Sequence, residues 1–79
     1  MDTVNYKGFE IQATPYHLTE TGHWRINIHI VRHTGDQVRS REFGANNSYP
    51  TREEAVQHCF QFGRQIVDGQ ATNCSVADL

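Results

Sequence analysis

The stretch WRINIHIVRH, residues 24–33, has the clearest strand pattern in the chain. Every second side chain is large and apolar, which is the period expected of a strand with one buried face. We therefore expect this stretch to be the central strand of a sheet. Its alternation predicts an inner face of Trp24, Ile26, Ile28 and Ile30 and an outer face of Arg25, Asn27, His29 and Val31.

A second strand is expected on the N-terminal side, in GFEIQAT at residues 8–14. Its apolar and polar side chains alternate, and Pro15 should end its regular pairing because proline has no N–H to donate. A further short strand over residues 3–6, turning back at Lys7 and Gly8, is an alternative that the sequence leaves open.

A third strand is expected in QVRSREF, residues 37–43, after a hairpin connection in TGD at residues 34–36. Val38 and Phe43 are five positions apart, so a regular strand cannot turn both inward. An inward Phe43 would also place the two arginines of this strand on the inner face. We therefore expect Val38 inward, and a bulge or the strand end near Glu42.

A helix is expected after YPTREEAVQHC, the stretch at residues 49–59. Thr51 followed three residues later by Glu54 matches a capping box, in which both side chains satisfy free N–H groups at the helix start. The helix should run over residues 52–68 and stop at Gly69.

The apolar side chains of this helix fall on one broad face when projected at ~100° per residue. Gly63 lies on that face, although glycine costs roughly 1 kcal/mol relative to alanine inside a helix. Its position predicts a close approach to a bulky residue of the sheet, with Trp24 as the best candidate. The face comprises Ala55, Val56, Cys59, Phe60, Phe62, Gly63, Ile66 and Val67.

These elements predict an α+β fold in the order β-β-β-α, with a three-stranded antiparallel sheet packed on one C-terminal helix. The 79 residues have room for one domain only. Residues 1–69 are expected to form this domain and residues 70–79 a mobile tail.

The composition favours a small cytosolic protein. No apolar run is long enough to cross a bilayer, and the N-terminus has neither segment of a signal peptide. Two cysteines suggest free thiols, because no disulfide framework or metal-binding pair is present. The net charge of −2 disfavours nucleic acid as a partner.

The sequence predicts no enzyme, no cofactor and no metal site. His29 and His33 are four positions apart on one strand, or about 13 Å, which is too far to share an ion. Cys59 lies on the apolar stripe of the helix and His58 projects elsewhere, so a cysteine–histidine nucleophile pair is not expected.

Three motifs resemble those of AP2/ERF-type DNA-binding domains and the related N-terminal domains of some phage integrases. The motifs are Tyr6-Lys7-Gly8-Phe9, then Gly22-His23-Trp24, then Tyr49-Pro50-Thr51-Arg52-Glu53-Glu54-Ala55-Val56. The whole chain also resembles a group of small bacterial proteins of unknown function. The AP2-type resemblance implies a three-stranded sheet on a helix, with the outer sheet face in the major groove. This sequence departs from the pattern at Glu10, Gln12 and Thr14, where that family has basic side chains.

Two functional hypotheses follow. The preferred one is a non-catalytic binding or regulatory module for an unknown protein partner or for self-association, with Val31 and Phe60 as exposed apolar contacts. The alternative is a nucleic-acid-binding domain that uses the outer face of the sheet. The side chains for that role are Arg25, Asn27, His29, Arg39 and Arg41.

Overall fold

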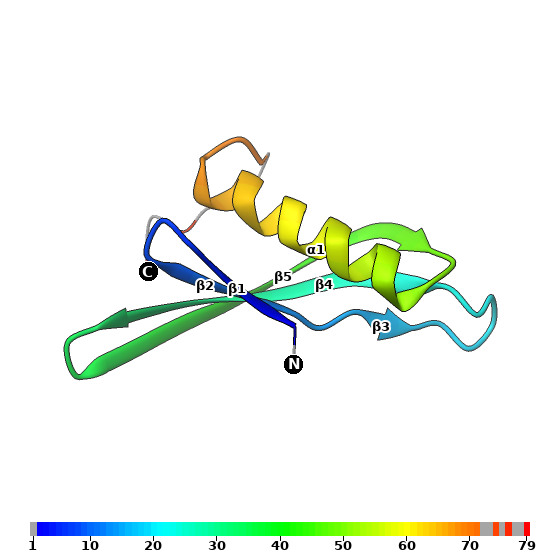
Figure 1. Cartoon of the computed structure of the whole chain (residues 1–79), viewed down its shortest axis with the longest axis horizontal. Helices are drawn as coiled ribbons and strands as arrows, with labels where there is room; N and C mark the ends of the chain where they lie inside the picture. The colour runs from blue at the N-terminus through cyan, green and yellow to red at the C-terminus, as the bar shows by residue number, and fades with distance from the viewer. Residues whose placement is uncertain (1, 72–73, 75, 77–78) are drawn as a thin grey trace.

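The computed structural model describes residues 2–71, 74, 76 and 79 of the chain. In this part of the chain, an antiparallel sheet packs on a single helix (Figure 1). The α+β class is confirmed, but the number of strands is five rather than three. The elements are β1 (Thr3–Tyr6), β2 (Phe9–Ala13), β3 (Tyr16–His17), β4 (Trp24–Thr34), β5 (Gln37–Tyr49) and α1 (Arg52–Val67).

The central strand is β4, as predicted. It pairs with β2 and β3 along one edge and with β5 along the other. Ala13 lies opposite Ile28, and Tyr16 lies opposite Arg25 in the same register. The short β3 therefore continues the line of β2 beyond Pro15, which interrupts the ladder without ending it.

The short N-terminal strand that the sequence left open is present as β1. It pairs with β2 through a two-residue turn at Lys7 and Gly8, whose φ angles are 49° and 85°. Positive φ at both positions is the requirement of a type I′ turn, the connection best suited to the twist of a hairpin. This hairpin adds β1 to the edge of the sheet.

The orientation predicted for β5 is wrong. Phe43 points inward and is 9% exposed, whereas Val38 points outward and is 63% exposed. The register runs without interruption from Thr34 opposite Gln37 to Asn27 opposite Gly44, so no bulge occurs near Glu42. The register shifts later, between Arg25 and Asn27 on β4.

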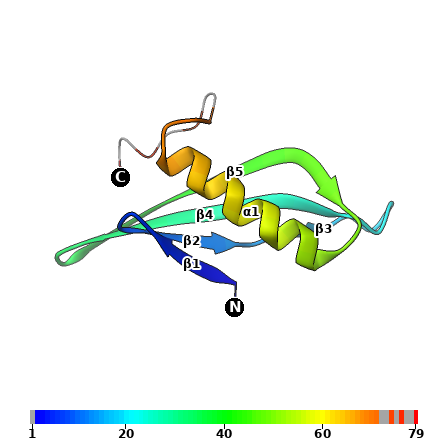
Figure 2. The same ribbon diagram turned by 45° about the horizontal axis from the view of Figure 1, so that its top comes forward.

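The reason for this error is the length of the β4–β5 hairpin. Figures 1 and 2 show its connected end extending beyond α1 and beyond the β1–β2 turn. An arginine on the inner side of that end is therefore not buried by the helix. All residues from 32 to 41 are exposed, so the expected cost of an inward arginine does not arise there.

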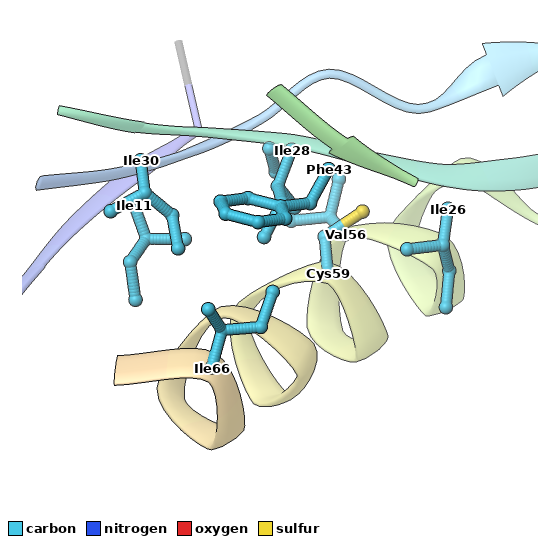
Figure 3. Packing of buried hydrophobic residues seen from close by; sticks show 9 residues of the cluster. Ile11, Ile26, Ile28, Ile30, Phe43, Val56, Cys59 and Ile66 are labelled. Atoms are coloured by element: carbon cyan, nitrogen blue, oxygen red, sulfur yellow. The ribbon is translucent and has the colours of Figure 1, made fainter. Parts of the chain in front are cut away.

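The core lies between α1 and the inner face of the sheet. Figure 3 shows isoleucines of β2 and β4 pointing toward Val56, Cys59 and Ile66 of the helix, with Phe43 among them. Burying each side chain of this size contributes about 1.5–3 kcal/mol relative to exposure. The buried cluster comprises Ile11, Ala13, Ile26, Ile28, Ile30, Phe43, Val56, Cys59 and Ile66.

Gly63 makes the predicted close approach, but the neighbour is Ile11 rather than Trp24. A Cβ at position 63 would lie 2.6 Å from Ile11 Cγ2. Trp24 is only half-buried and stacks on His17, with 4.6 Å between ring centroids. It lies at the end of β4, away from the buried cluster.

The predicted start of the helix at Arg52 is confirmed, and its last residue is Val67, one residue earlier than predicted. Thr51 is the N-cap, and its hydroxyl accepts a hydrogen bond of 3.2 Å from the N–H of Glu54. Asp68 is the C-cap, and Gly69 follows with a φ of 76°. Positive φ directly after the cap is the usual way for a glycine to end a helix.

Described residues beyond the helix lie against the core. Ala71, Cys74, Val76 and Leu79 are partly buried there. The predicted mobile tail at residues 70–79 falls partly on residues 72–73, 75 and 77–78, which lie outside the described residues. Its mobility stays a prediction.

Candidate nucleic-acid interface

The outer face of the sheet carries a network of hydrogen-bonded polar side chains. Asn27, one of the predicted nucleic-acid contacts, is only 5% exposed. Its Nδ2 donates to Thr14 Oγ1 at 2.9 Å and to Glu42 Oε2 at 3.1 Å. The amide of Asn27 is therefore occupied in joining β4 to β5 and to Thr14, the residue after β2, and is not presented to a ligand.

Two histidines of β4 face carboxylates on the same outer surface. His29 Nε2 lies 3.4 Å from Glu42 Oε2, and His33 Nε2 lies 3.6 Å from Glu10 Oε2. Each pair is an ion pair only when the histidine is protonated. The acidic partners offset positive charge on this face, so it lacks the basic character on which phosphate binding depends.

Arg25 is held within the chain at the irregular part of β5. Its Nε donates to the backbone oxygen of Ala45 at 3.0 Å, and its Nη2 donates to Asn46 Oδ1 at 2.8 Å. These bonds span the register shift between Arg25 and Asn27. The side chain therefore stabilises a bulge, a feature common near functional sites.

Arg39 and Arg41 do not lie on the outer face, where the sequence analysis placed them. Arg41 is opposite Ile30 and Arg39 is opposite Arg32. Because directly paired residues share a face, both arginines lie on the inner side with the buried Ile30. The two-residue loop of the hairpin fixes this parity, and Val38 takes the outer position instead.

Three arginines are therefore gathered on one side of the projecting hairpin. We call residues 32–41 the hairpin arm and name the side that carries Arg32, Arg39 and Arg41 its arginine side. The arm also holds Asp36 in its loop, so it carries three positive charges and one negative charge within a chain of net charge −2. The positive charge of the molecule is concentrated there.

The arginines of the arm also make contacts within the chain. Arg32 Nη1 donates to the backbone oxygen of Leu79 at 2.8 Å, and its guanidinium lies 5.4 Å from the centre of the Phe9 ring. Arg39 and Arg41 take part in further interactions. Despite these contacts, all three residues remain exposed.

Sequence reasoning missed Arg32 as a site residue. The signal that identifies it is the hairpin loop itself. With Gly35 and Asp36 as a two-residue loop, Thr34 pairs with Gln37 and Arg32 must pair with Arg39. The sequence indicates a hairpin connection at residues 34–36 but does not fix the length of the loop.

The two predicted apolar contacts differ in exposure. Val31 is 8% exposed, because it lies between Glu10 and Ser40 within the outer polar surface. It is therefore not the exposed contact that alternation predicted. Phe60 is half-buried against the core, and its role in binding a protein stays a prediction.

Cys59 is a buried core residue, as predicted. Its Sγ donates to the backbone oxygen of Asn27 at 3.4 Å. Burial raises the pKa of the Cys59 thiol, which disfavours the reactive thiolate. Among the described residues, no three histidine, cysteine or acidic side chains are grouped as metal ligands would be.

Within the described residues, no helix has both the length and the apolar character needed to span a membrane. No curated protein and no solved structure is significantly similar to this chain.

The model of one protein family, however, matches residues 1–74, which is nearly the whole chain. That family is described as "Transcriptional activator HlyU". It is neither of the two DNA-binding families whose motifs the sequence resembles. On this match over both the sheet and the helix, the chain belongs to the HlyU family of transcriptional activators.

Proposed function

We propose that this domain regulates transcription by binding DNA through the arginine side of its hairpin arm. The family description supports a role in transcription. The observation that carries the proposal is the pairing of Arg32 with Arg39, with Arg41 beside them, on the exposed end of a β-hairpin. Two-stranded β-ribbons fit the major groove of DNA.

The chemistry of arginine supports a binding role for these side chains. Arg32 and Arg39 occupy directly paired positions, so both project from the same side of the hairpin. A DNA phosphate matches guanidinium geometry well, because it can accept two parallel hydrogen bonds from one arginine.

The arm replaces the outer sheet face as the proposed interface. On that face, Arg25 is bonded to the β5 bulge, and Glu10 and Glu42 are paired with histidines. Binding there would bring carboxylates close to phosphate. The arginine side of the arm is the opposite side of the sheet from Glu10 and Glu42, so binding there avoids the two carboxylates.

The test is a titration of duplex DNA into the purified chain, followed by backbone amide shifts and by fluorescence anisotropy. We expect non-specific binding with a Kd of about 100 μM or tighter at low salt. Three phosphate contacts predict that affinity falls roughly 40-fold between about 50 mM and about 200 mM salt. The shifts should centre on residues 32–41.

Matched variants make this test specific. Replacing Arg32, Arg39 and Arg41 with alanine should weaken binding by about tenfold or more and flatten the salt dependence. Arg64→Ala removes one positive charge from the exposed side of α1 and should leave affinity nearly unchanged. Binding that survives the triple change, or depends equally on Arg64, would refute the proposed interface.

We also propose that the domain is not an enzyme and that it works in the cytosol. Both statements rest on the description of the family as transcriptional activators, because such proteins act on DNA by binding.

A second candidate function is binding of another protein by the outer sheet face. It is favoured by Val38, which is 63% exposed on that face. Amide shifts on β2 and β4 when an RNA polymerase preparation is added, with no response to DNA, would favour this function over the first.

A further inference from the structure

A groove runs between the middle and second half of α1 and the bulged part of β5, at the opposite end of β5 from the hairpin arm. Its volume is about 280 Å³, close to the lower limit of small-ligand pockets. The residues that line it are Ile26, Ala45, Asn47, Tyr49, His58, Gln61, Phe62 and Gln65. The function proposed above makes no use of this groove.

The lining combines flat aromatic surfaces with neutral hydrogen-bonding groups. Tyr49 and His58 stack face to face, with ring centroids 4.0 Å apart and an interplanar angle of 3°. The amides of Asn47, Gln61 and Gln65 each offer both donors and acceptors. No aspartate, glutamate, lysine or arginine is among the lining residues.

The wall of the groove is fixed by the rest of the fold. Asn47 belongs to the bulged segment, which Arg25 holds through Ala45 and Asn46. Ile26, at 4% exposure, anchors the groove to the core. Preorganised walls of this kind reduce the entropy lost when a ligand binds.

We propose that this groove binds an uncharged planar heteroaromatic ring with amide-like edges, of the nucleobase class. A flat ring suits the aromatic wall, since base–aromatic stacking contributes substantially to binding. Asparagine and glutamine amides form paired hydrogen bonds with the edge of adenine. No charged residue lines the groove, so nothing there would compensate the cost of desolvating an ionic ligand. The groove therefore selects against such ligands.

Such a ring has two sources, which the experiment separates. It is either a free nucleoside-like small molecule or a base carried on a single strand of nucleic acid. A titration with adenosine and one with a short oligodeoxyadenosine strand distinguish them. If the strand binds more tightly than adenosine, the groove binds bases of a nucleic-acid strand. If the affinity of the strand, divided by its number of bases, equals that of adenosine, the groove binds a free small molecule.

The readout is the set of side-chain amide signals in nitrogen-15 spectra of the whole chain. We expect adenosine to shift the signals of Asn47, Gln61 and Gln65 in a saturable way. Benzoate, which is flat but charged, should not. Absence of a saturable shift, or equal shifts with benzoate, would overturn the proposal.

The helix offers a matched control. Gln61→Ala and Gln65→Ala should each weaken adenosine binding about fivefold or more, because each removes a hydrogen-bonding amide. Gln57→Ala removes an exposed amide from the same helix that does not line the groove, and it should bind as the unchanged chain does. Equal effects at all three positions would refute the site.

The proposed groove site and the proposed DNA contact can be tested independently of each other. The alanine variants of the hairpin arm should bind adenosine normally, because the arm and the groove lie at opposite ends of β5. The groove variants should likewise keep the salt-dependent response to duplex DNA.

Discussion

At the scale of single residues, Gly63 decides how closely the helix lies on the sheet. An added Cβ would meet Ile11 Cγ2 at 2.6 Å, and Ile11 is fully buried. That methyl group is attached to the branched Cβ of Ile11, so it can move aside only through a change of the χ1 rotamer or a shift of the strand. The close approach of the α1 backbone to the Ile11 side chain of β2 therefore depends on the absence of a side chain at position 63.

Gly63→Ala should consequently destabilise the domain, although alanine favours a helix by roughly 1 kcal/mol. Overpacking of a tight core costs about 1–3 kcal/mol and offsets that gain. Urea unfolding should show a smaller effect of Gly63→Ala in an Ile11→Ala background, where the clash is removed. Equal effects in both backgrounds would show that the helix does not rest on Ile11.

Cys59 is the residue whose chemistry the packing suppresses. Because burial raises its pKa, we expect iodoacetamide to modify Cys59 much more slowly than Cys74 in the folded chain. Peptide mass spectrometry measures both rates in one sample, and unfolding in urea should make them similar. Equal rates before unfolding would contradict the buried position of Cys59.

At the scale of elements, the end of α1 is tied to the β1–β2 turn. Asp68 accepts hydrogen bonds from Lys7 Nζ at 2.5 Å and from the Tyr6 hydroxyl at 2.8 Å. The bond from Lys7 is the main reason that the pKa of Asp68 is lowered, followed by the bond from Tyr6. The pKa of Lys7 is raised by the same contact.

This tie predicts a pH dependence of stability. A carboxyl group with a lowered folded pKa stabilises the fold above its unfolded pKa of about 3.9, and loses that effect as the pH falls through the folded value. Asp68→Asn should therefore lower the Tm at about pH 6, with the difference closing toward about pH 2. Asp36→Asn, a loss of the same charge in the hairpin loop, serves as the control. If the Tm of Asp68→Asn differed from that of the unchanged chain by the same amount at all pH values, the stabilising contact of Asp68 with Lys7 and Tyr6 would be refuted.

The start of α1 gives a second prediction at this scale. Thr51→Ala should destabilise the domain by about 1 kcal/mol, because the N–H of Glu54 loses its acceptor. Thr51→Ser keeps a hydroxyl at the same place and should retain most of the stability. Denaturant midpoints of the three proteins check this, and an equal loss for serine would exclude the cap as the cause.

The extent to which sequence predicts this fold also differs between elements. The helix and β4 were predictable because their signals are local, namely a cap, a glycine stop and regular alternation. The inward side of β5 was not, since it depends on how far α1 covers the hairpin. Arg39 and Arg41 are tolerated on the inner side because α1 does not cover that end of the sheet, which is a property of tertiary packing.

The candidate site shows the same division. The residue types of the outer face suggested a nucleic-acid surface. However, the partners of Arg25 were set by the β5 bulge, which no local pattern indicated, and Asn27 is bonded to Thr14 and Glu42 across the neighbouring strands. Conversely, the pairing of Arg32 with Arg39 follows from the register of the hairpin once its loop is known to have two residues. Pairing across strands therefore determined which polar side chains remain available.

At the scale of the whole molecule, the sheet has an open edge along β5. Within the described part of the chain, β5 pairs only with β4, and an open edge invites pairing with a second copy. A twofold axis through Ser40 of two antiparallel β5 edges would place Arg39 opposite Arg41, and an axis through Arg41 would place the two copies of Arg41 opposite each other. Charged side chains on an edge are a common protection against such pairing.

The arginines of β5 are therefore expected to have two separable roles, protection of the edge and binding of DNA. Arg39→Val with Arg41→Val should impair both, so that light scattering detects self-association and duplex binding is weakened. Arg39→Glu with Arg41→Glu keeps like charges on the edge but repels phosphate, so that this variant should stay monomeric and still fail to bind DNA. Self-association of the glutamate variant would show that charge does not protect the edge, and DNA binding by it would show that the arm is not the interface.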